Sequence, residues 1–337
     1  MEKFGKSQST KRVEDLRFLT GQGRYVDDIA PEGALRAYFL RSSVGHGRIT
    51  ELDVSDAREA EGVHLVLTLA DLEAAGMKVA MDGHRVRNAD GSKGAGPERP
   101  LLARARVRYV GEPVAMIVAD TLQQAKDAAE MIGLDVADED AHLALATGGP
   151  TLHDEAPGNL AFDWALGDGD AVDAALAGAA HVVTVEVPDN RIIVNSMEPR
   201  GCYAEPEDNG RLHIAVNGQG VWGPKKNAAY HLDMPADDIR VTNPDTGGGF
   251  GMKGMDYNET FVVAHAARVL DRPVRWMSER TEAILSDNAG RDLTTTATLG
   301  FDADHRLVAY RADTLSNLGA DNSGFAQAIQ SELFSKV

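Results

Sequence analysis

The chain has 337 residues, 43% of them hydrophobic, which is enough for about two domains with packed cores. Its net charge of −18 comes from acidic residues spread along the whole length, which argues for solubility and against nucleic-acid binding. No apolar run reaches the roughly 18 residues that a membrane span needs, and the N-terminus lacks an apolar signal core. We therefore expect a cytoplasmic protein without a membrane span.

The first seventeen residues are polar and are predicted to form a flexible arm. Residues 18–140 then alternate between short strand-like and helix-like patterns, which predicts a compact α+β domain. Its clearest helix is amphipathic and is capped by Thr121. The expected strands are 35–41, 49–54, 63–68, 107–110 and 114–119, and the expected helices are 55–60, 70–75 and 122–132.

Residues 141–160 are rich in turn-forming residues and are predicted to be a linker. A second domain is expected from residue 161 to residue 337. Its expected helices are 171–179, 228–232 and 257–270, and its expected strands are 182–187, 212–216, 239–243, 274–277, 293–300 and 307–315.

The single cysteine, Cys202, excludes an internal disulfide and any cysteine-ligated cluster made by this chain alone. It lies where a strand is expected to begin, and this favours a buried structural thiol over a catalytic one. Four arginines cluster on an alternating strand-like segment, where exposure to solvent is the ordinary explanation: Arg99, Arg104, Arg106 and Arg108.

The strand expected at 239–243 leads into a segment with four glycines in five positions, Asn243-Pro-Asp-Thr-Gly-Gly-Gly-Phe-Gly-Met-Lys-Gly254. Ordered glycine costs conformational entropy, so this glycine loop implies positive φ angles or a close approach by another molecule. A helix is expected after it, and a helix N-terminus with unpaired N–H groups suits an anionic cofactor. On these residues alone, a plain tight turn and a cofactor loop are equally supported.

Part of the loop matches the dinucleotide-binding pattern G-x-G-x-x-G through Gly249, Gly251 and Gly254. Asp271 follows at about the spacing of a ribose-binding acid. However, Asp271 lies in a loop-like Leu-Asp-Arg-Pro stretch, and such a fingerprint normally opens a domain. A nicotinamide-binding oxidoreductase therefore remains only an alternative.

Other catalytic patterns are weak. No histidine or carboxylate cluster has metal-ligand spacing, and the hydrolase pattern G-x-S-x-G does not occur. The sequence context of Glu198 favours a structural hydrogen-bonding role, with a catalytic role as the alternative. Gln219, by its position alone, is a turn residue.

Five phrases together are more specific than any one motif. They occur in the order Arg17-Phe-Leu-Thr-Gly-Gln-Gly-Arg-Tyr-Val-Asp-Asp28, Arg108-Tyr-Val-Gly-Glu-Pro-Val-Ala, His153-Asp-Glu-Ala-Pro-Gly-Asn, Asn195-Ser-Met-Glu-Pro-Arg and Pro244-Asp-Thr-Gly-Gly-Gly-Phe-Gly-Met-Lys. From residue 17 onward the chain resembles the large subunit of the molybdenum hydroxylases, the xanthine dehydrogenase and aldehyde oxidase family. Within that family it is most similar to the aerobic carbon monoxide dehydrogenase-type large chains.

The resemblance implies that residues 18–140 form an α/β hammerhead domain and that 161–337 begin the molybdopterin-binding domain. It implies a molybdenum–molybdopterin cofactor, in the cytosine dinucleotide form, and no metal-ligating residue in this chain. Gln219 matches the family glutamine that hydrogen-bonds an oxygen ligand of the metal. Gly249, Phe250 and Gly251 match the loop that presents main-chain amides to the cofactor, and Phe250 would wall the substrate channel.

The reaction that the resemblance implies is hydroxylation of a small molecule, an aldehyde or an N-heterocycle, with water as the oxygen source. Electrons would leave through an iron–sulfur small subunit and an FAD-containing medium subunit, which fits a chain with one cysteine. Xanthine-oxidising relatives carry a substrate-binding glutamate after the lysine of the loop. This chain has Gly254 there, so purine oxidation loses support.

The family's large subunit is more than twice as long as this chain, and its glutamate base is expected beyond the matched part. We therefore expect a fragment or a split-gene product, inactive without the C-terminal half of the large subunit as its partner. A non-catalytic remnant or an assembly module is the alternative.

Overall fold

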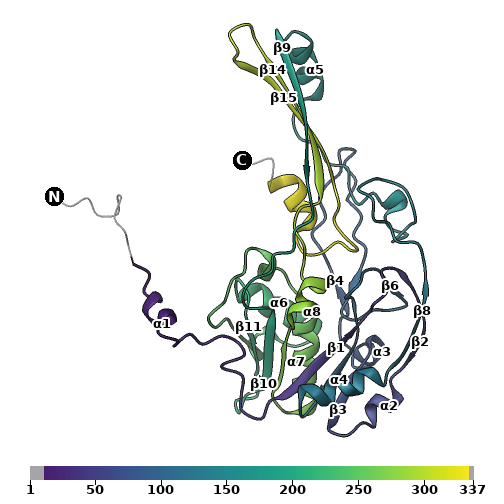
Figure 1. Cartoon of the computed structure of the whole chain (residues 1–337), viewed down its shortest axis with the longest axis vertical. Helices are drawn as coiled ribbons and strands as arrows, with labels where there is room; N and C mark the ends of the chain where they lie inside the picture. Colours follow the sequence, from purple (N-terminus) through teal and green to yellow (C-terminus); the bar gives the residue numbers. More distant parts are fainter. Residues whose placement is uncertain (1–10, 334–337) are drawn as a thin grey trace, which may run out of the picture.

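A mixed seven-stranded sheet forms the centre of the molecule, which the computed structural model describes from residue 11 to residue 333 (Figure 1). Its strands lie in the order β12–β11–β10–β13–β1–β7–β3. The pairs β1–β13 and β11–β12 are parallel, and the other pairs are antiparallel. These strands are β1 (Leu35–Arg41), β3 (Val63–Leu67), β7 (Pro113–Ala119), β10 (Gly201–Pro206), β11 (Leu212–Val216), β12 (Ile239–Thr242) and β13 (Val274–Met277).

This sheet runs across both predicted domains. Three of its strands come from residues 18–140 and four from residues 161–337, and they meet where β1 lies parallel to β13. At the same junction Phe39 packs edge-on against Trp276, with 5.7 Å between the ring centroids. The mixture of helices and strands confirms the predicted fold class, while the domain boundaries stay a prediction. What the sequence did not indicate is that the two parts share one sheet.

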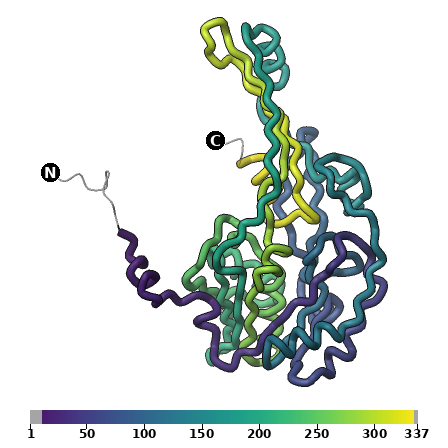
Figure 2. The backbone as a smooth tube through the Cα atoms, viewed as in Figure 1, coloured from purple at the N-terminus to yellow at the C-terminus, as the bar shows by residue number. Residues whose placement is uncertain are grey.

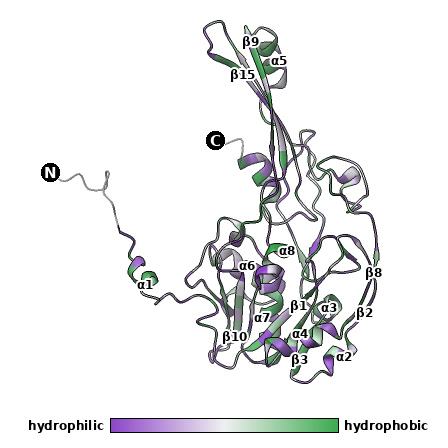
Figure 3. Cartoon of the chain, in the orientation of Figure 1, coloured by the Kyte–Doolittle hydropathy of each residue, from purple (hydrophilic) through white to green (hydrophobic). Residues whose placement is uncertain are grey.

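Two helices cover the faces of the sheet, and strand β7 is buried between them. Ala115 and Ile117 pack with α4 (Leu122–Glu130), whereas Met116 and Val118 join the cluster that contains α7 (Asn258–Leu270). Alternate side chains of a strand point to opposite faces, so both faces of β7 are covered. Figure 3 shows that α7 is largely hydrophobic, as expected for a helix buried in the core.

A smaller three-stranded sheet lies beside the first part of the large one. It consists of β6 (Arg106–Val107), β2 (Gly47–Asp53) and β8 (Gly133–Asp138), of which β8 was not predicted. The expectation that the arginines of this region face solvent is wrong for Arg99, in β5 (Arg99–Pro100), which pairs with β4 (Ala80–Met81). Arg99 is buried because its side chain lies 3.6 Å from the carboxylate of Asp321 and donates to Ser323.

A third sheet projects from the body as a long finger (Figures 1 and 2). It is made of β9 (His181–Asp189), β14 (Leu293–Phe301) and β15 (Leu307–Ser316), and α5 (Gly169–Ala177) packs against its tip. Several apolar side chains of the finger are about half exposed, namely Val183, Val185, Val187 and Tyr310. The finger therefore keeps an uncovered apolar face.

The chain enters the body through an arm that contains the short helix α1 (Asp15–Leu19) (Figure 2). The predicted flexible arm, residues 1–17, lies partly outside the described residues. The remaining helices are α2 (Ser55–Arg58), α3 (Leu69–Ala74), α6 (Trp222–His231), α8 (Arg280–Ser286) and α9 (Ala326–Ala328), with single turns at Pro157–Asn159, Ala236–Asp238, Met252–Gly254 and Ile329–Leu333. Within residues 11–333, no helix combines the length and apolar character needed to cross a membrane.

The environment of Cys202 gives a direct test of the core. The thiol lies at the start of β10 with 2% of the residue exposed, and burial raises its pKa to about 12. We expect the native chain to resist a thiol reagent at pH 8, because the thiolate is the reactive form and this thiol stays protonated and shielded. Concentrated guanidinium chloride should release one reactive thiol per chain. Rapid labelling of the folded chain would contradict the buried position.

Candidate functional site

The glycine loop, defined as residues 247–254, lies between β12 and α7, and several of its residues have positive φ angles. Gly248 and Gly251 have φ angles of 101° and 87°. Phe250 also has a positive φ, 51°, which is uncommon for a residue with a side chain and costs backbone energy. Such strain persists only where surrounding contacts impose it, and it gathers at functional sites. The strained backbone at Phe250 is therefore a reason to examine the loop as a candidate site.

Three successive N–H groups of the glycine loop have no hydrogen-bond partner in the described part of the chain. Gly247 donates to Glu198 and Gly251 donates to Gln219, each over 2.8 Å. Between these two anchors, the N–H groups of Gly248, Gly249 and Phe250 form no hydrogen bond with any other part of residues 11–333. Successive free N–H groups in a turn with positive φ angles form a concave site for an anion.

Gln219 lies directly against this loop. Its Oε1 accepts the bond from Gly251, and its backbone N–H donates to the carbonyl oxygen of Lys253 over 3.2 Å. A Cβ atom on Gly249 would lie 2.7 Å from the Gln219 side-chain amide, so only glycine leaves that side chain in place. Because Oε1 faces the loop, Nε2 is the end of the amide that remains free to donate to a ligand.

The two ends of the loop are joined by a buried ion pair. Glu198 Oε2 accepts from both the Gly247 N–H and the Lys253 ammonium, over 2.8 and 3.0 Å. The Lys253 side chain is 1% exposed, and burial lowers its pKa although Glu198 opposes the shift. Glu198 thus has the structural hydrogen-bonding role that its sequence context favoured. Sequence reasoning missed Lys253 as its partner.

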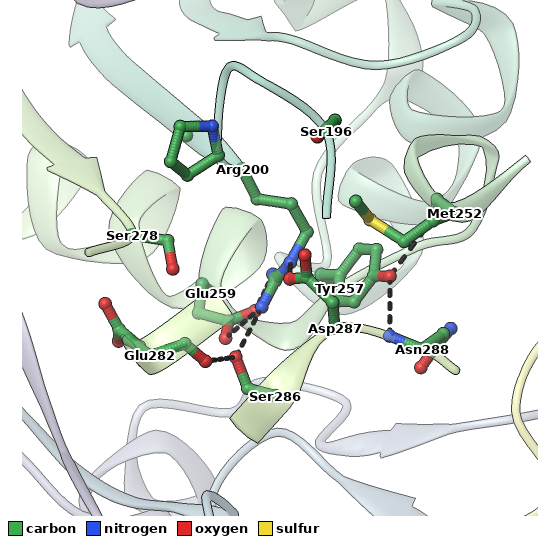
Figure 4. A network of polar contacts seen from close by, with 12 residues as sticks. Ser196, Arg200, Met252, Tyr257, Glu259, Ser278, Glu282, Ser286, Asp287 and Asn288 are labelled. Atoms are coloured by element: carbon green, nitrogen blue, oxygen red, sulfur yellow. Dashed lines mark hydrogen bonds and ion pairs between the residues drawn. The ribbon is translucent and has the colours of Figure 1, made fainter. Parts of the chain in front are cut away.

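Arg200 holds the segment that carries Glu198 (Figure 4). Its guanidinium donates to Glu259 over 2.8 and 3.3 Å, to Asp287 over 2.5 Å and to Ser286 over 2.9 Å. It also stacks on the Tyr257 ring, 3.7 Å from its centroid. The network therefore joins three segments around the loop: the Glu198 segment, the start of α7 and the end of α8.

A second arginine extends the network into the first half of the chain. Arg41, at the end of β1, donates to Glu259 and to Glu282 over 2.7 Å each. Burial alone would raise the pKa of the Glu259 carboxyl, but Arg200 and Arg41 outweigh it and hold that pKa well below its usual range. For Glu282 the balance is reversed, and burial raises its pKa despite Arg41.

A cleft of about 400 Å³ opens beside the glycine loop. Phe250, Gly251 and Met252 form one wall, and the segments 285–291 and 317–321 form others. The Tyr257 hydroxyl ties two of these walls together, because it donates to Met252 and accepts from the backbone of Asn288. The volume is within the range of small-molecule sites. Phe250 lies at its edge, with 77% of the residue exposed.

Gly254 ends the loop beside Gln219. A Cβ atom on Gly254 would lie 3.7 Å from the Gln219 amide, which is an ordinary van der Waals distance. The backbone there does not require glycine, because its φ is not positive. A residue with a side chain would therefore fit at position 254, and the space beside Gln219 exists because this residue is glycine.

The dinucleotide alternative does not fit this geometry. The strands before and after α7 are β12 and β13, and β11 and β10 lie between them in the sheet. Asp271 is the C-terminal cap of α7, with φ 50°, and is not at the end of the following strand. A dinucleotide fold instead needs adjacent parallel strands with the acid at the end of the second one.

Comparison with known families identifies both halves of the chain. Residues 20–140 match the aldehyde oxidase and xanthine dehydrogenase a/b hammerhead domain, and residues 152–337 match the molybdopterin cofactor-binding domain. The chain belongs to the molybdenum hydroxylase large-subunit family. The predicted family and the predicted succession of hammerhead and molybdopterin-binding domains are confirmed.

Individual relatives agree with this assignment. The chain is 36% identical over 319 residues to the nicotine 6-hydroxylase large subunit of Paenarthrobacter nicotinovorans, an alignment that covers 92% of this chain and 38% of the relative. It is 30% identical over 327 residues to the carbon monoxide dehydrogenase large chain of Afipia carboxidovorans, covering 92% and 39%. The chain therefore spans about two fifths of the length of these curated relatives.

Solved structures show the same fold. The CO dehydrogenase from Oligotropha carboxidovorans superposes with a TM-score of 0.80 at 29% identity, covering 91% of this chain and 39% of that chain. Quinoline 2-oxidoreductase from Pseudomonas putida 86 superposes with a TM-score of 0.77, also at 29% identity and with the same coverage.

The buried network predicts a strong dependence of stability on Glu259. Glu259→Gln keeps the shape of the side chain but leaves Arg41 and Arg200 without their shared counter-charge. Removing one partner of a buried ion pair costs about 3–5 kcal/mol, and we expect the free energy of unfolding in urea to fall by that amount. The control is Asp304→Asn, which breaks a pair between Asp304 and Arg306 that is about three quarters exposed. It should change stability by less than about 0.5 kcal/mol.

The pairing of Glu259 with Arg41 and Arg200 also predicts how the stability of the fold depends on pH. A carboxyl whose pKa is lowered on folding stabilises the native state fully above its ordinary value of 4.5 and loses this contribution as the pH falls through the folded pKa. The stability difference between the natural chain and Glu259→Gln should therefore be constant at neutral pH and shrink in acid. A difference that grows below pH 4.5 would refute the role given to Glu259.

Proposed function

We propose that this chain forms the loop side of the cofactor site in a molybdenum-dependent hydroxylase, which oxidises a small molecule with water as the oxygen source. The observation that carries the proposal is the row of three free N–H groups at residues 248–250, with the Gln219 amide beside it. Fixed donors of this kind stabilise negative charge without reorganisation. Membership in the molybdenum hydroxylase family supports molybdenum–molybdopterin as the group, and the cytosine dinucleotide form is part of the proposal.

The donor set fits such a group. Residues 11–333 contain no cluster of three histidine, cysteine, aspartate or glutamate side chains that could hold a metal ion directly. The loop instead offers hydrogen-bond donors, which suit the oxygen atoms of a cofactor that carries its own metal. Gly249 leaves the space that the Gln219 side chain occupies beside these donors.

Each residue then has a defined part in the reaction. The N–H groups of Gly248, Gly249 and Phe250 would face the cofactor, and Gln219 would add a donor through Nε2. Gly251, which the resemblance also assigns to this loop, would instead hold the Gln219 side chain, because its N–H donates to Gln219 Oε1. The bound group would supply the oxidation–reduction chemistry. Phe250, at the edge of the cleft, orients a flat substrate and excludes water, while Glu198 and Lys253 neutralise each other's charge beneath the loop. The catalytic base is expected from the C-terminal half.

An N-heteroaromatic molecule is the substrate class that we favour, with an aldehyde as the second candidate. Two relatives are named for nicotine and quinoline, and the alignments to both cover most of this chain. Gly254 leaves the position of the purine-binding glutamate without a side chain, which argues against xanthine. The wall formed by Phe250 suits a flat ring.

The proposed partners are the C-terminal half of the large subunit, an iron–sulfur small subunit and an FAD-containing medium subunit. Several relatives are named as large subunits, and one is named as a subunit of a dehydrogenase complex. The test is to purify the chain with all three partners, measure molybdenum and pterin, and assay quinoline, an aromatic aldehyde and hypoxanthine. We expect bound cofactor and fastest oxidation of quinoline. A complete assembly free of molybdenum and pterin would support a non-catalytic module instead.

Gln219 gives the most specific variant. Gln219→Glu keeps the oxygen that accepts from Gly251 but removes the Nε2 donor and adds a negative charge. In the cofactor-loaded assembly we expect a loss of about 10²–10³ in kcat, the usual cost of one transition-state donor. Thermal stability should change little, because the side chain is exposed.

The matched control for this variant is Gln123→Ala, which removes an exposed amide from the surface helix α4. It should leave both turnover and stability unchanged. A large loss of thermal stability in Gln219→Glu with unchanged turnover would count against the role of Gln219.

A further inference from the structure

We propose that residues 15–25 form a hook that grips Asp245 and thereby positions the glycine loop, with Arg17 and Asp245 as positioning residues. This inference rests on the proposed function for its purpose, but its geometry is independent of any cofactor. The hook contains the first nine residues of the first of the five phrases, Arg17-Phe-Leu-Thr-Gly-Gln-Gly-Arg-Tyr25, and Asp245 belongs to the last phrase. The structure brings these two phrases together.

The hook is closed by a recognisable helix end. The N–H of Gln22 donates to the Arg17 carbonyl over 2.8 Å, and the N–H of Gly21 donates to the Phe18 carbonyl over 3.2 Å. These two bonds are the Schellman motif, which needs a left-handed residue at the position after the cap. Gly21 fills that position with a φ of 73°. The turn after α1 is therefore determined by its own sequence.

Two aromatic rings complete the hook. Phe18 and Tyr25 stack with 6.4 Å between their ring centroids. Gly23 lies under them, because a Cβ atom there would come within 2.9 Å of the Tyr25 ring and 3.3 Å of the Phe18 ring. Gly21 is thus required by the turn after α1, and Gly23 by its close approach to the two rings. As a result, the Arg17 side chain and the Arg24 backbone lie on the same side of the hook.

That side holds both the side chain and the backbone of Asp245. The Arg17 guanidinium binds the Asp245 carboxylate through both of its terminal nitrogens, with Nη2 to Oδ1 at 2.7 Å. The Arg24 N–H donates to the same carboxylate over 2.7 Å, and the Asp245 N–H donates back to the Arg24 carbonyl over 3.1 Å. Two-point pairing of arginine with a carboxylate fixes orientation as well as distance.

Asp245 is the contact point of the hook that lies nearest in sequence to the free N–H groups. Two residues later, the N–H of Gly247 donates to Glu198, and the N–H of Gly251 donates to Gln219. Within residues 11–333, the N–H groups between Gly247 and Gly251 form no hydrogen bond, and the Gly249 carbonyl accepts only from Lys253 of the same loop, over 3.3 Å. The position of this stretch therefore depends mainly on contacts at its two ends, and the hook supplies the outermost of them.

The contact is also electrostatically favourable. The Arg17 hydrogen bond is the main cause that lowers the pKa of Asp245, and the Arg24 N–H acts in the same direction. The Asp245 side chain is 14% exposed and that of Arg17 is 38% exposed, so the pair is partly shielded from solvent. Shielded two-point pairs resist screening better than isolated surface pairs.

The test compares variants of the 337-residue chain by residue-resolved amide exchange. Arg17→Gln removes the guanidinium, Asp245→Asn keeps the size of the side chain, and Arg17→Lys keeps the charge but not the two-point geometry. We expect exchange at Gly247 and Gly251 to rise about tenfold or more in the first two variants and less in Arg17→Lys, because the loop opens locally. Amides of the β10–β11 ladder should be unaffected.

The control is Arg12→Gln in the same arm, because within residues 11–333 the Arg12 side chain forms an ion pair only with the exposed Asp15, at 3.5 Å. It should not change exchange in the loop. Unchanged loop exchange in Arg17→Gln and Asp245→Asn would overturn the proposal, since the hook would then only tether the arm. An equal rise in the β10–β11 ladder would also overturn it, because the pair would then stabilise the whole fold.

A second measurement separates this inference from the proposed function. In the assembled enzyme, Arg17→Gln should lower the molybdenum and pterin content, while the Arg12→Gln assembly retains both. If the Arg17→Gln assembly contained as much molybdenum and pterin as the unaltered assembly, the role of the hook in the cofactor site would be overturned. Absence of cofactor from the unaltered assembly would refute the proposed function, and the amide exchange would still decide whether the hook positions the loop.

Discussion

The arrangement around the glycine loop depends on one buried guanidinium. Arg200 is paired with Glu259 and Asp287 and stacked on Tyr257, so it fixes the segment of Glu198, the first turn of α7 and the end of α8 relative to one another. Each of these segments then contributes a contact to the loop or to the cleft. Burying such charges is unfavourable, and the pairing offsets that cost only when the geometry is complete. The network therefore specifies one arrangement more than it adds stability.

The same network also joins the two halves of the chain. Arg41 comes from β1 and shares Glu259 with Arg200, while β1 itself pairs with β13. The charge network and the shared sheet thus cross the same boundary. The glycine loop, whose N–H groups at 248–250 have no partner among residues 11–333, is thus supported from both sides of this junction.

Local patterns in the sequence predicted most of the helices and strands, because apolar periodicity and the cap at Thr121 are encoded within short windows. They also singled out the glycine loop, and the five phrases indicated the family. Longer-range pairings could not be predicted. Lys253 meets Glu198 from 55 residues away and Arg17 meets Asp245 from 228 residues away, and the burial of Arg99 depends on Asp321. An alternating pattern marks a strand face but does not reveal the distant carboxylate that covers it.

The space beside Gly254 has a consequence for how this site can evolve. A side chain added there would touch Gln219 at an ordinary contact distance and would need no left-handed backbone. A single substitution at Gly254 would therefore place a new functional group next to Gln219 without disturbing Arg200, Glu198 or the hook. Under the proposed function, Gly254 is therefore the position at which a substitution would alter the ring that is bound with the least effect on the fold.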